Sequence, residues 1–482
     1  MNLRDADLRF LLPEAPRSVA FLDAAPEAKE AWQAAGIRVL EPSTAAPPDV
    51  VIASASRLQD AVERHAPMVV LNGRASRRRL AASGYCGAHL LTRPSPSAPR
   101  LVVPITSRAA LASALSPVGP RRLSAATARR TLGRIILRLG WAPARAVVTV
   151  AAREGVPRPW LVDQVARATE IARLDDWYLW LGEGDPLQRA VLHLVAPDGG
   201  WALKFSRVLG NTTPFHREEQ ASRAAMRLPG PLARHVPRLI AHGTDAGLPF
   251  AVETRFAGRS LTEILLSSWS VPRRLDYVQR VARWLHDVAM ATKTEPAALA
   301  VERERLARVV APTSVDAGAI ADAMSAVEHV PGVLVHNDPG TWNVVVDRRG
   351  YFGVVDWESS RATGMPLWDL TYFLADALTL VELRRFGDRT AAILKLFRGE
   401  SAHSGLLFQH VRHAVSELGL EAHAVGPLVT LGWLHHALSP QQRRARLRKA
   451  GADEDTDRGV LSLLSQPWLA DLALGFGWRS WQ

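Results

Sequence analysis

The sequence predicts a chain of two unlike parts, an α/β region at the N-terminus and a larger α+β unit in which a β-rich segment precedes a helical one. Up to about residue 115, short apolar runs alternate with helix-like runs, which is typical of a parallel α/β layer. Hairpin-like strands fill residues 159–257, and Leu- and Ala-rich helical stretches dominate the end of residues 258–482. The 482 residues, 48% of them hydrophobic, are enough for two or three packed domains.

The N-terminal region, residues 1–115, resembles a Rossmann-like domain of the methyltransferase type. Its expected strands are residues 19–22, 39–40, 50–52, 69–71 and 102–105. The stretch after the first strand, residues 23–27 (DAAPE), has none of the glycines that let backbone approach a cofactor closely. We therefore expect a structural or partner-binding domain here, without a cofactor loop.

A connecting region follows at residues 116–158. It contains an Arg-rich stretch with helical character at residues 125–139 and an expected strand at residues 146–151. The sequence assigns it no role.

The stretch with the clearest chemical signal is residues 333–374. An apolar run at residues 333–335 leads into His336 and Asp338, and Asn343 follows five residues later. Two further apolar runs, at residues 344–346 and 351–355, form an expected hairpin that ends at Asp356. This pattern predicts a polar loop followed by a β-hairpin.

These residue types suit phosphoryl transfer, which needs positioning and electrostatic stabilisation. Asp338 is placed to accept or orient the proton of an attacking hydroxyl. Asn343 and Asp356 suit Mg²⁺, which prefers oxygen ligands and is usually held by one or two carboxylates beside water and phosphate oxygens. His336 is expected to brace the loop. Asp and Asn are also common in turns, so the bare motif has a structural alternative.

At these positions the sequence resembles the aminoglycoside phosphotransferase and choline kinase family, whose catalytic loop is H-G-D-x-x-x-x-N with a metal-binding Asp further on. Only the glycine differs, since Asn337 takes its place. Residues 364–370 (GMPLWDL) resemble the family's G-x-P-x-x-D-L segment, in which the Asp, here Asp369, stabilises the loop. The resemblance implies a bilobal, protein-kinase-like fold, an N-lobe at residues 159–257 and a C-lobe at residues 258–482.

The resemblance also implies a nucleotide site in the N-lobe. The turn with Gly182 and Gly184 is expected to lie over the phosphates of ATP, although a plain hairpin turn would explain these glycines equally well. Lys204 stands within an apolar strand, where an unpaired charge would be costly. In the family such a lysine binds phosphates and pairs with a glutamate of the next helix. Both Glu218 and Glu219 are candidates, and we favour Glu219, because Met226 and Leu228 then stand where the family's helix carries apolar residues. From the order of the strands, the adenine is expected to contact the backbone at residues 253–256.

The function that these features predict is ATP- and Mg²⁺-dependent transfer of phosphate to a hydroxyl of a small molecule. Only twelve residues separate Asp356 from Asp369, which leaves no room for the activation loop of a protein kinase. A pseudokinase or scaffold, which would bind nucleotide or a partner without turnover, is the alternative.

The composition indicates which kinds of binding partner and substrate to expect. The net charge is +12, but the Arg clusters at residues 77–79 and 443–449 are not interleaved with aromatic residues, so we do not expect nucleic-acid binding. A single cysteine, no long apolar stretch and no signal-like N-terminus indicate a cytoplasmic protein without membrane contact. Acidic residues are sparse after residue 380, which disfavours a polycationic aminoglycoside as acceptor.

Overall fold

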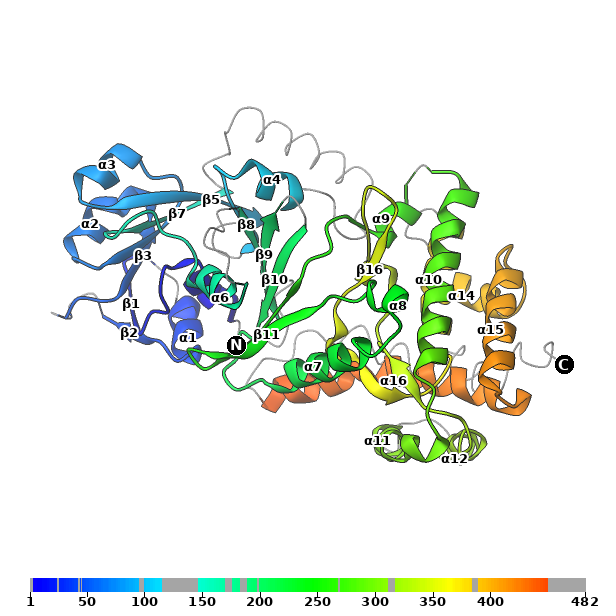
Figure 1. Ribbon diagram of the computed structural model, residues 1–482. Coiled ribbons are helices and arrows are strands. Elements are labelled where there is room, and N and C mark those ends of the chain that lie inside the picture. The colour runs from blue at the N-terminus through cyan, green and yellow to red at the C-terminus, as the bar shows by residue number, and fades with distance from the viewer. Residues whose placement is uncertain are drawn as a thin grey trace.

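The computed structural model describes residues 3–449 except for residues 24–25, 42–43, 45, 95–98, 115–145, 170–175, 183–188, 197–198, 268, 311–316 and 384–388. The chain forms a large mixed β-sheet followed by a helical part (Figure 1). The Arg-rich stretch at residues 125–139 lies outside the described residues. Within the described part, no helix is both long enough and apolar enough to span a membrane.

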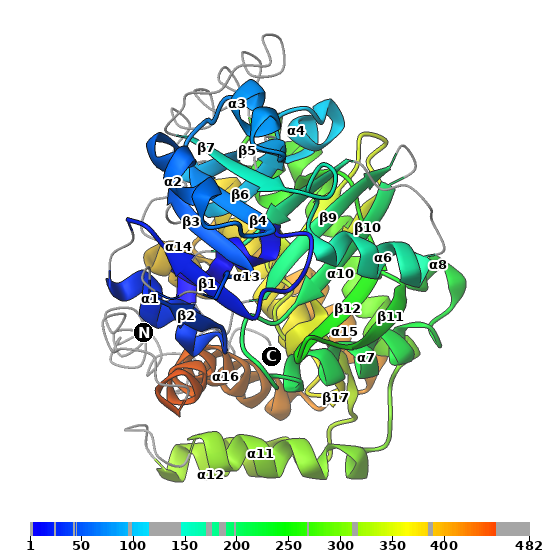
Figure 2. The same ribbon diagram turned by 90° about the vertical axis from the view of Figure 1, so that its left-hand side faces the viewer.

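Four parallel strands form one end of the sheet, in the order β2-β1-β3-β4, as the alternating pattern predicted. They are β1 (Ser18–Phe21), β2 (Arg38–Leu40), β3 (Val50–Ser54) and β4 (Met68–Asn72), with η1 (Leu3–Leu11), α1 (Pro26–Ala34), η2 (Ala55–Arg57), α2 (Leu58–Glu63) and α3 (Arg77–Ala82) around them. Figure 2 shows this end of the molecule from the front. Their apolar side chains lie on both faces because helices cover both.

The next strands run antiparallel, so the expectation that residues 102–105 extend the parallel layer is wrong. β5 (Cys86–Pro94) and β6 (Pro99–Pro104) are adjacent in the chain and pair antiparallel, because so short a connection cannot make the crossover that parallel pairing requires. β7 (Val147–Ala152), from the predicted connecting region, lies between β4 and β5. The Rossmann-like assignment is therefore not confirmed.

The sheet continues without a break into the predicted N-lobe, because β6 pairs with β8. The N-lobe strands are β8 (Trp177–Trp180), β9 (Ala190–Ala196), β10 (Gly199–Phe205), β11 (Leu239–Asp245) and β12 (Leu248–Thr254), and its helices are α6 (Trp160–Thr169), α7 (Thr213–Ala225) and α8 (Gly230–Ala233). The helix α4 (Arg108–Ala114) of the N-terminal region packs against β6, β8 and β9. One hydrophobic core extends from Phe10 and Trp32 to Leu203 and Val252. The N-terminal elements and the N-lobe thus share both a sheet and a core.

The remaining chain is mainly helical and packs around α10 (Val271–Ala291) and α13 (Trp368–Leu383). Its other helices are α9 (Leu261–Leu265), η4 (Pro296–Leu299), α11 (Ala300–Val310), α12 (Ala317–Ala326), η5 (Thr341–Asn343), η6 (Trp357–Ser359), α14 (Arg389–Phe397), α15 (Ser404–Leu418) and α16 (Ala422–Lys449). The short strands are β13 (Arg259–Ser260), β14 (Val333–Val335), β15 (Val344–Val346), β16 (Phe352–Val354) and β17 (Arg361–Gly364). β15 and β16 pair antiparallel as the expected hairpin, and the polar loop leads directly into β15.

Candidate active site

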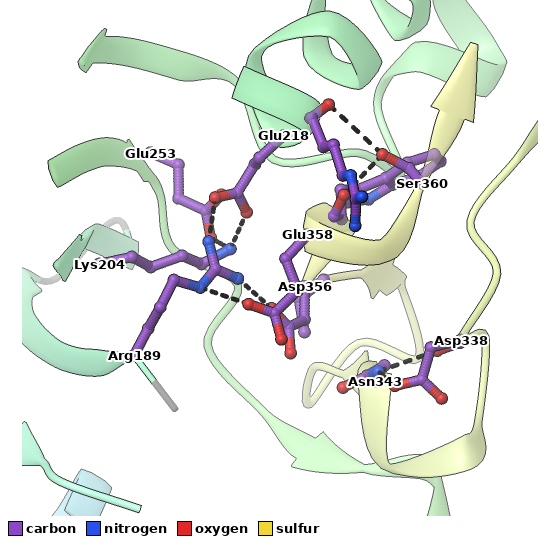
Figure 3. Close-up of polar contacts among 12 residues, drawn as sticks. Arg189, Lys204, Glu218, Glu253, Asp338, Asn343, Asp356, Glu358 and Ser360 are labelled. Atoms are coloured by element: carbon purple, nitrogen blue, oxygen red, sulfur yellow. Dashed lines mark hydrogen bonds and ion pairs between the residues drawn. The ribbon is translucent and has the colours of Figure 1, made fainter. Parts of the chain in front are cut away.

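Asp338 lies on the loop between β14 and η5, beside Asn343. The amide nitrogen of Asn343 donates to the main-chain oxygen of Asp338 at 2.9 Å and to its carboxylate at 3.1 Å (Figure 3). Burial raises the pKa of Asp338 to about 8, and the negative charge of Asp356 adds to the rise, while hydrogen bonds from Trp342 and Asn343 oppose it. The predicted base is thus a carboxylate with a high affinity for a proton.

His336 braces this loop in the neutral form. Its Nε2 lies 2.9 Å from the carbonyl oxygen of Val355, and its Nδ1 lies 3.3 Å from the backbone nitrogen of Asp338. A carbonyl only accepts and an N–H only donates, so the proton belongs on Nε2. Burial lowers the pKa of His336 to about 4. The ring connects the loop to the end of β16.

Asn337 explains the one departure from the family motif. Its backbone has φ of 63°, in the left-handed region that glycine adopts freely and that Asn tolerates better than most other residues. The carboxylate of Asp369 accepts hydrogen bonds from the backbone nitrogens of His336 and Asn337, at 2.5 and 2.9 Å. The side-chain amide of Asn337 donates to the carbonyl of Ser359 at 3.0 Å. The loop is therefore held on two sides.

Asp356 follows β16 and has a left-handed backbone with φ of 71°. Its carboxylate is about half-buried and forms an ion pair with Arg189 (Figure 3). Burial favours the neutral acid, but the positive charges of Arg189 and Lys204 lower the pKa of Asp356, so it is ionised. It lies between these cations and the catalytic loop.

Lys204 projects from β10 into a pair of buried carboxylates. It contacts Glu218 of α7 and lies 2.8 Å from Glu253 of β12. Burial alone would lower the pKa of Lys204, but the two carboxylates raise it, so the ammonium keeps its charge. The expected lysine–glutamate pair is present, with a second carboxylate that the sequence did not indicate.

The glutamate of that pair is Glu218, so the preference for Glu219 is wrong. Glu218 shares the buried face of α7 with Phe215, Ala221 and Ser222, at the i, i+3 and i+4 spacing of one helix face. Glu219 lies one residue further and contacts Arg223 and His242 instead. The small buried residues at positions 221, 222 and 225 were the signal that could have identified Glu218.

Arg189 is the functional candidate that the sequence did not reveal. It immediately precedes β9, and only 4% of its side chain is exposed. It contacts Glu218 and Asp356, and its Nε lies 2.8 Å from Glu358. Because nearly all basic residues of the chain are arginines, nothing in the composition distinguished this one.

The glycine turn and the expected adenine contact are only partly described. Gly182 has φ of 67°, whereas Gly184 lies outside the described residues. A cavity of about 1470 Å³ opens where the sheet joins the helical part, and Thr254, Phe256 and Val345 contribute to its lining. It reaches residues 254–256 of the segment that is expected to contact a nucleotide base, whereas Lys204, Asp338 and Asp356 are not among its lining residues.

Nearly half of the chain matches a known protein family. Residues 182–406 match the family model described as the phosphotransferase enzyme family, APH. The match contains Arg189, Lys204, the loop with Asp338 and Asn343, and Asp356. No curated protein matches the chain.

Several solved structures are similar in shape to part of the chain. A candidate aminoglycoside phosphotransferase from Ralstonia eutropha is 15% identical with a TM-score of 0.42, over 66% of this chain and 96% of the other. A spectinomycin phosphotransferase, solved with ADP and spectinomycin, is 8% identical with a TM-score of 0.35, and the match covers 66% of this chain and 98% of the other. An aminoglycoside phosphotransferase from Streptomyces rimosus, solved with ADP and streptomycin, is 14% identical with a TM-score of 0.33, and the match covers 56% of this chain and 98% of the other.

Proposed function

We propose, on the premise that residues 182–406 match the phosphotransferase enzyme family, that the chain transfers the γ-phosphate of ATP to a hydroxyl of a small molecule, with Mg²⁺. Phosphotransfer is the activity of the family, whereas the donor, the metal and the acceptor are the parts proposed here. The observation that carries the proposal is the convergence of Lys204, Asp356, Asn343 and Asp338 from separate elements toward one region (Figure 3).

The residues present fit a Mg²⁺ ion bound together with nucleotide. The amide oxygen of Asn343 takes part in no hydrogen bond among the described residues, since the amide nitrogen makes the bonds to Asp338. Asp356 offers an ionised carboxylate. No three His, Cys, Asp or Glu residues in the described ranges gather closely enough to hold a metal by themselves. A site with one carboxylate and one amide oxygen suits Mg²⁺, which would take its remaining ligands from water and phosphate. The ion would neutralise negative charge on the phosphates.

The buried cations would hold the phosphates. Lys204 is the expected contact for the α- and β-phosphates, and Glu218 fixes its position. Arg189 lies between Glu218 and Asp356, so it supplies a second positive charge on the same side. The base of the nucleotide would occupy the cavity beside Thr254 and Phe256.

Asp338 would orient the attacking hydroxyl and accept its proton. Its raised pKa matches that task, because a base works best when its pKa lies near the working pH. His336 and Asn343 hold the carboxylate and backbone of Asp338 in place while the oxygen of the acceptor attacks the γ-phosphorus. His336 and Asn343 keep the same protonation state throughout this reaction.

The test is phosphate transfer from γ-labelled ATP with Mg²⁺ across a pool of hydroxylated metabolites. We expect Asp338→Ala to reduce product formation by about 10²- to 10⁴-fold, the range for a lost acid–base group. Asp276→Ala, a change at an exposed aspartate of α10, serves as the control and should keep full activity. If the native chain forms no labelled product, hydrolyses no ATP and is not stabilised by Mg·ATP, the scaffold alternative replaces the enzyme.

A further inference from the structure

Four partly exposed aromatic side chains form a strip beside Asp338, which we call the aromatic strip: Trp342, Tyr372, Trp433 and His436. The ring of Trp342 meets Tyr372 edge to face, with centroids 6.3 Å apart. Tyr372 stacks on His436 at 4.0 Å and lies 5.9 Å from Trp433. These residues come from η5, α13 and α16, so the strip joins the catalytic loop to the C-terminal helices.

Trp342 connects the strip to the reacting region. Its side chain is 37% exposed, which is unusual for a large apolar residue here, and it acts as a hydrogen-bond donor to Asp338. Its ring covers Gly340, where an added Cβ would lie 2.3 Å from the indole. The loop therefore has a glycine where the ring needs room. The exposed indole therefore lies beside the carboxylate that would receive the hydroxyl proton.

The charges behind the strip are mainly positive. His435 stacks on Trp368 and has its Nδ1 3.3 Å from the guanidinium of Arg305. The pKa of His435 is well below its usual value because of burial, and the positive charges of Arg305, Arg361 and Arg217 contribute to that decrease. Glu302 is the carboxylate that pairs with Arg305 and lies 3.6 Å from Arg361. Arg305, Arg361 and Arg217 thus outnumber Glu302 around His435, which disfavours a cationic acceptor on this side of the strip.

We propose that the aromatic strip is the acceptor subsite, and that the acceptor is a ring-bearing hydroxyl compound without positive charge whose ring lies against Trp342. This inference rests on the proposed function. The acceptor oxygen forms a bond to the γ-phosphorus, the bond from that phosphorus to the β–γ bridging oxygen breaks, and ADP leaves with the electron pair. The hydroxyl proton passes to Asp338. Aromatic side chains favour flat apolar faces, such as those of aromatic rings and many sugars.

The test uses the full chain labelled with 5-fluorotryptophan and observed by ¹⁹F NMR, with the Trp342 resonance assigned from Trp342→Phe. The neutral probe is 4-nitrophenyl β-D-glucoside and the polycationic probe is streptomycin, each with and without Mg·ADP. We expect the glucoside to shift the Trp342 resonance and streptomycin to leave it unchanged. A response to streptomycin alone, or to neither probe, overturns the proposal.

Kinetics provide the second readout once a transferable acceptor is found. Trp342→Leu should raise the KM of that acceptor about tenfold or more with the KM of ATP unchanged, and Trp342→Phe should recover most of the loss. Trp201→Leu is the matched control, because Trp201 is also partly buried but lies on the face of β10 opposite Lys204. An equal rise in both KM values would assign Trp342 to loop structure. ATP hydrolysis by the native chain tests the proposed function separately, since it needs no acceptor.

Discussion

The two sides of the candidate site are held in place by different forces. On the catalytic loop, Asp338 is positioned by hydrogen bonds from Asn343 and from its own backbone to His336, all within a few residues. On the N-lobe side, Lys204 is positioned by buried ion pairs, and Arg189 reaches Asp356 across 167 residues of sequence. The first side depends on local backbone geometry, and the second depends on a balance of charges brought together by the fold.

This difference predicts how each side responds to mutation. A neutral hydrogen bond contributes about 0.5–1.5 kcal/mol, so the loop should lose stability in small steps. Removing one partner of a buried ion pair leaves the other charge uncompensated, which costs about 3–5 kcal/mol.

Substitutions at Glu218 and at its neighbour Glu219 should differ most in their effect on stability. Glu218→Gln leaves Lys204 and Arg189 each short of a carboxylate inside the protein, so we expect the free energy of unfolding to fall by about 3–5 kcal/mol. Glu219→Gln affects pairs with Arg223 and His242 at the surface and should cost at most about 1 kcal/mol. Urea unfolding of both variants measures the difference. Equal losses would mean that the buried network does not stabilise the fold.

The same contrast explains what could be predicted from the sequence. The loop with Asp338 is a local feature, so the spacing of residues 336–343 and Asp356, together with the family resemblance, singled them out as candidates, and the hairpin between them was expected. Even the substitution at Asn337 follows local rules, because a left-handed backbone accepts Gly or Asn. Where a feature depends on interactions between residues close in sequence, the sequence was sufficient to predict it.

The long-range features could not be predicted in this way. Arg189 became a candidate only when the fold placed it between Glu218 and Asp356. The preference for Glu219 failed because it relied on Met226 and Leu228, although Met226 is 59% exposed and both residues lie beyond the end of α7. The antiparallel strands β5 to β7 were missed because apolar runs show that a strand exists but not which neighbour it pairs with.

Substitution of Arg189 should change the affinity for Mg²⁺ by an intermediate amount. The guanidinium of Arg189 pairs with the carboxylate of Asp356, one of the two expected Mg²⁺ ligands. Arg189→Met should therefore increase the affinity for Mg²⁺ without nucleotide by about tenfold, which corresponds to about 1.4 kcal/mol. Calorimetric titration with Mg²⁺ measures this, and Arg158→Met, at an arginine paired with Asp163 on the surface, is the control. Weaker Mg²⁺ binding in Arg189→Met would show that Arg189 supports the ligand Asp356 instead of competing for it.

The smallest effect concerns the loop backbone at Asn337. Both Asn337→Gly and Asn337→Ala remove the hydrogen bond to the carbonyl of Ser359, so a comparison of the two isolates the backbone conformation. Alanine must adopt a φ of 63° at a cost of about 1 kcal/mol, whereas glycine adopts it freely. Urea unfolding should place Asn337→Ala below Asn337→Gly by about that amount, with the activity of the glycine variant close to that of the native chain. If alanine were tolerated as well as glycine, the left-handed geometry would not be what this position of the loop requires, and the hydrogen bonds to Asp369 would hold the loop by themselves.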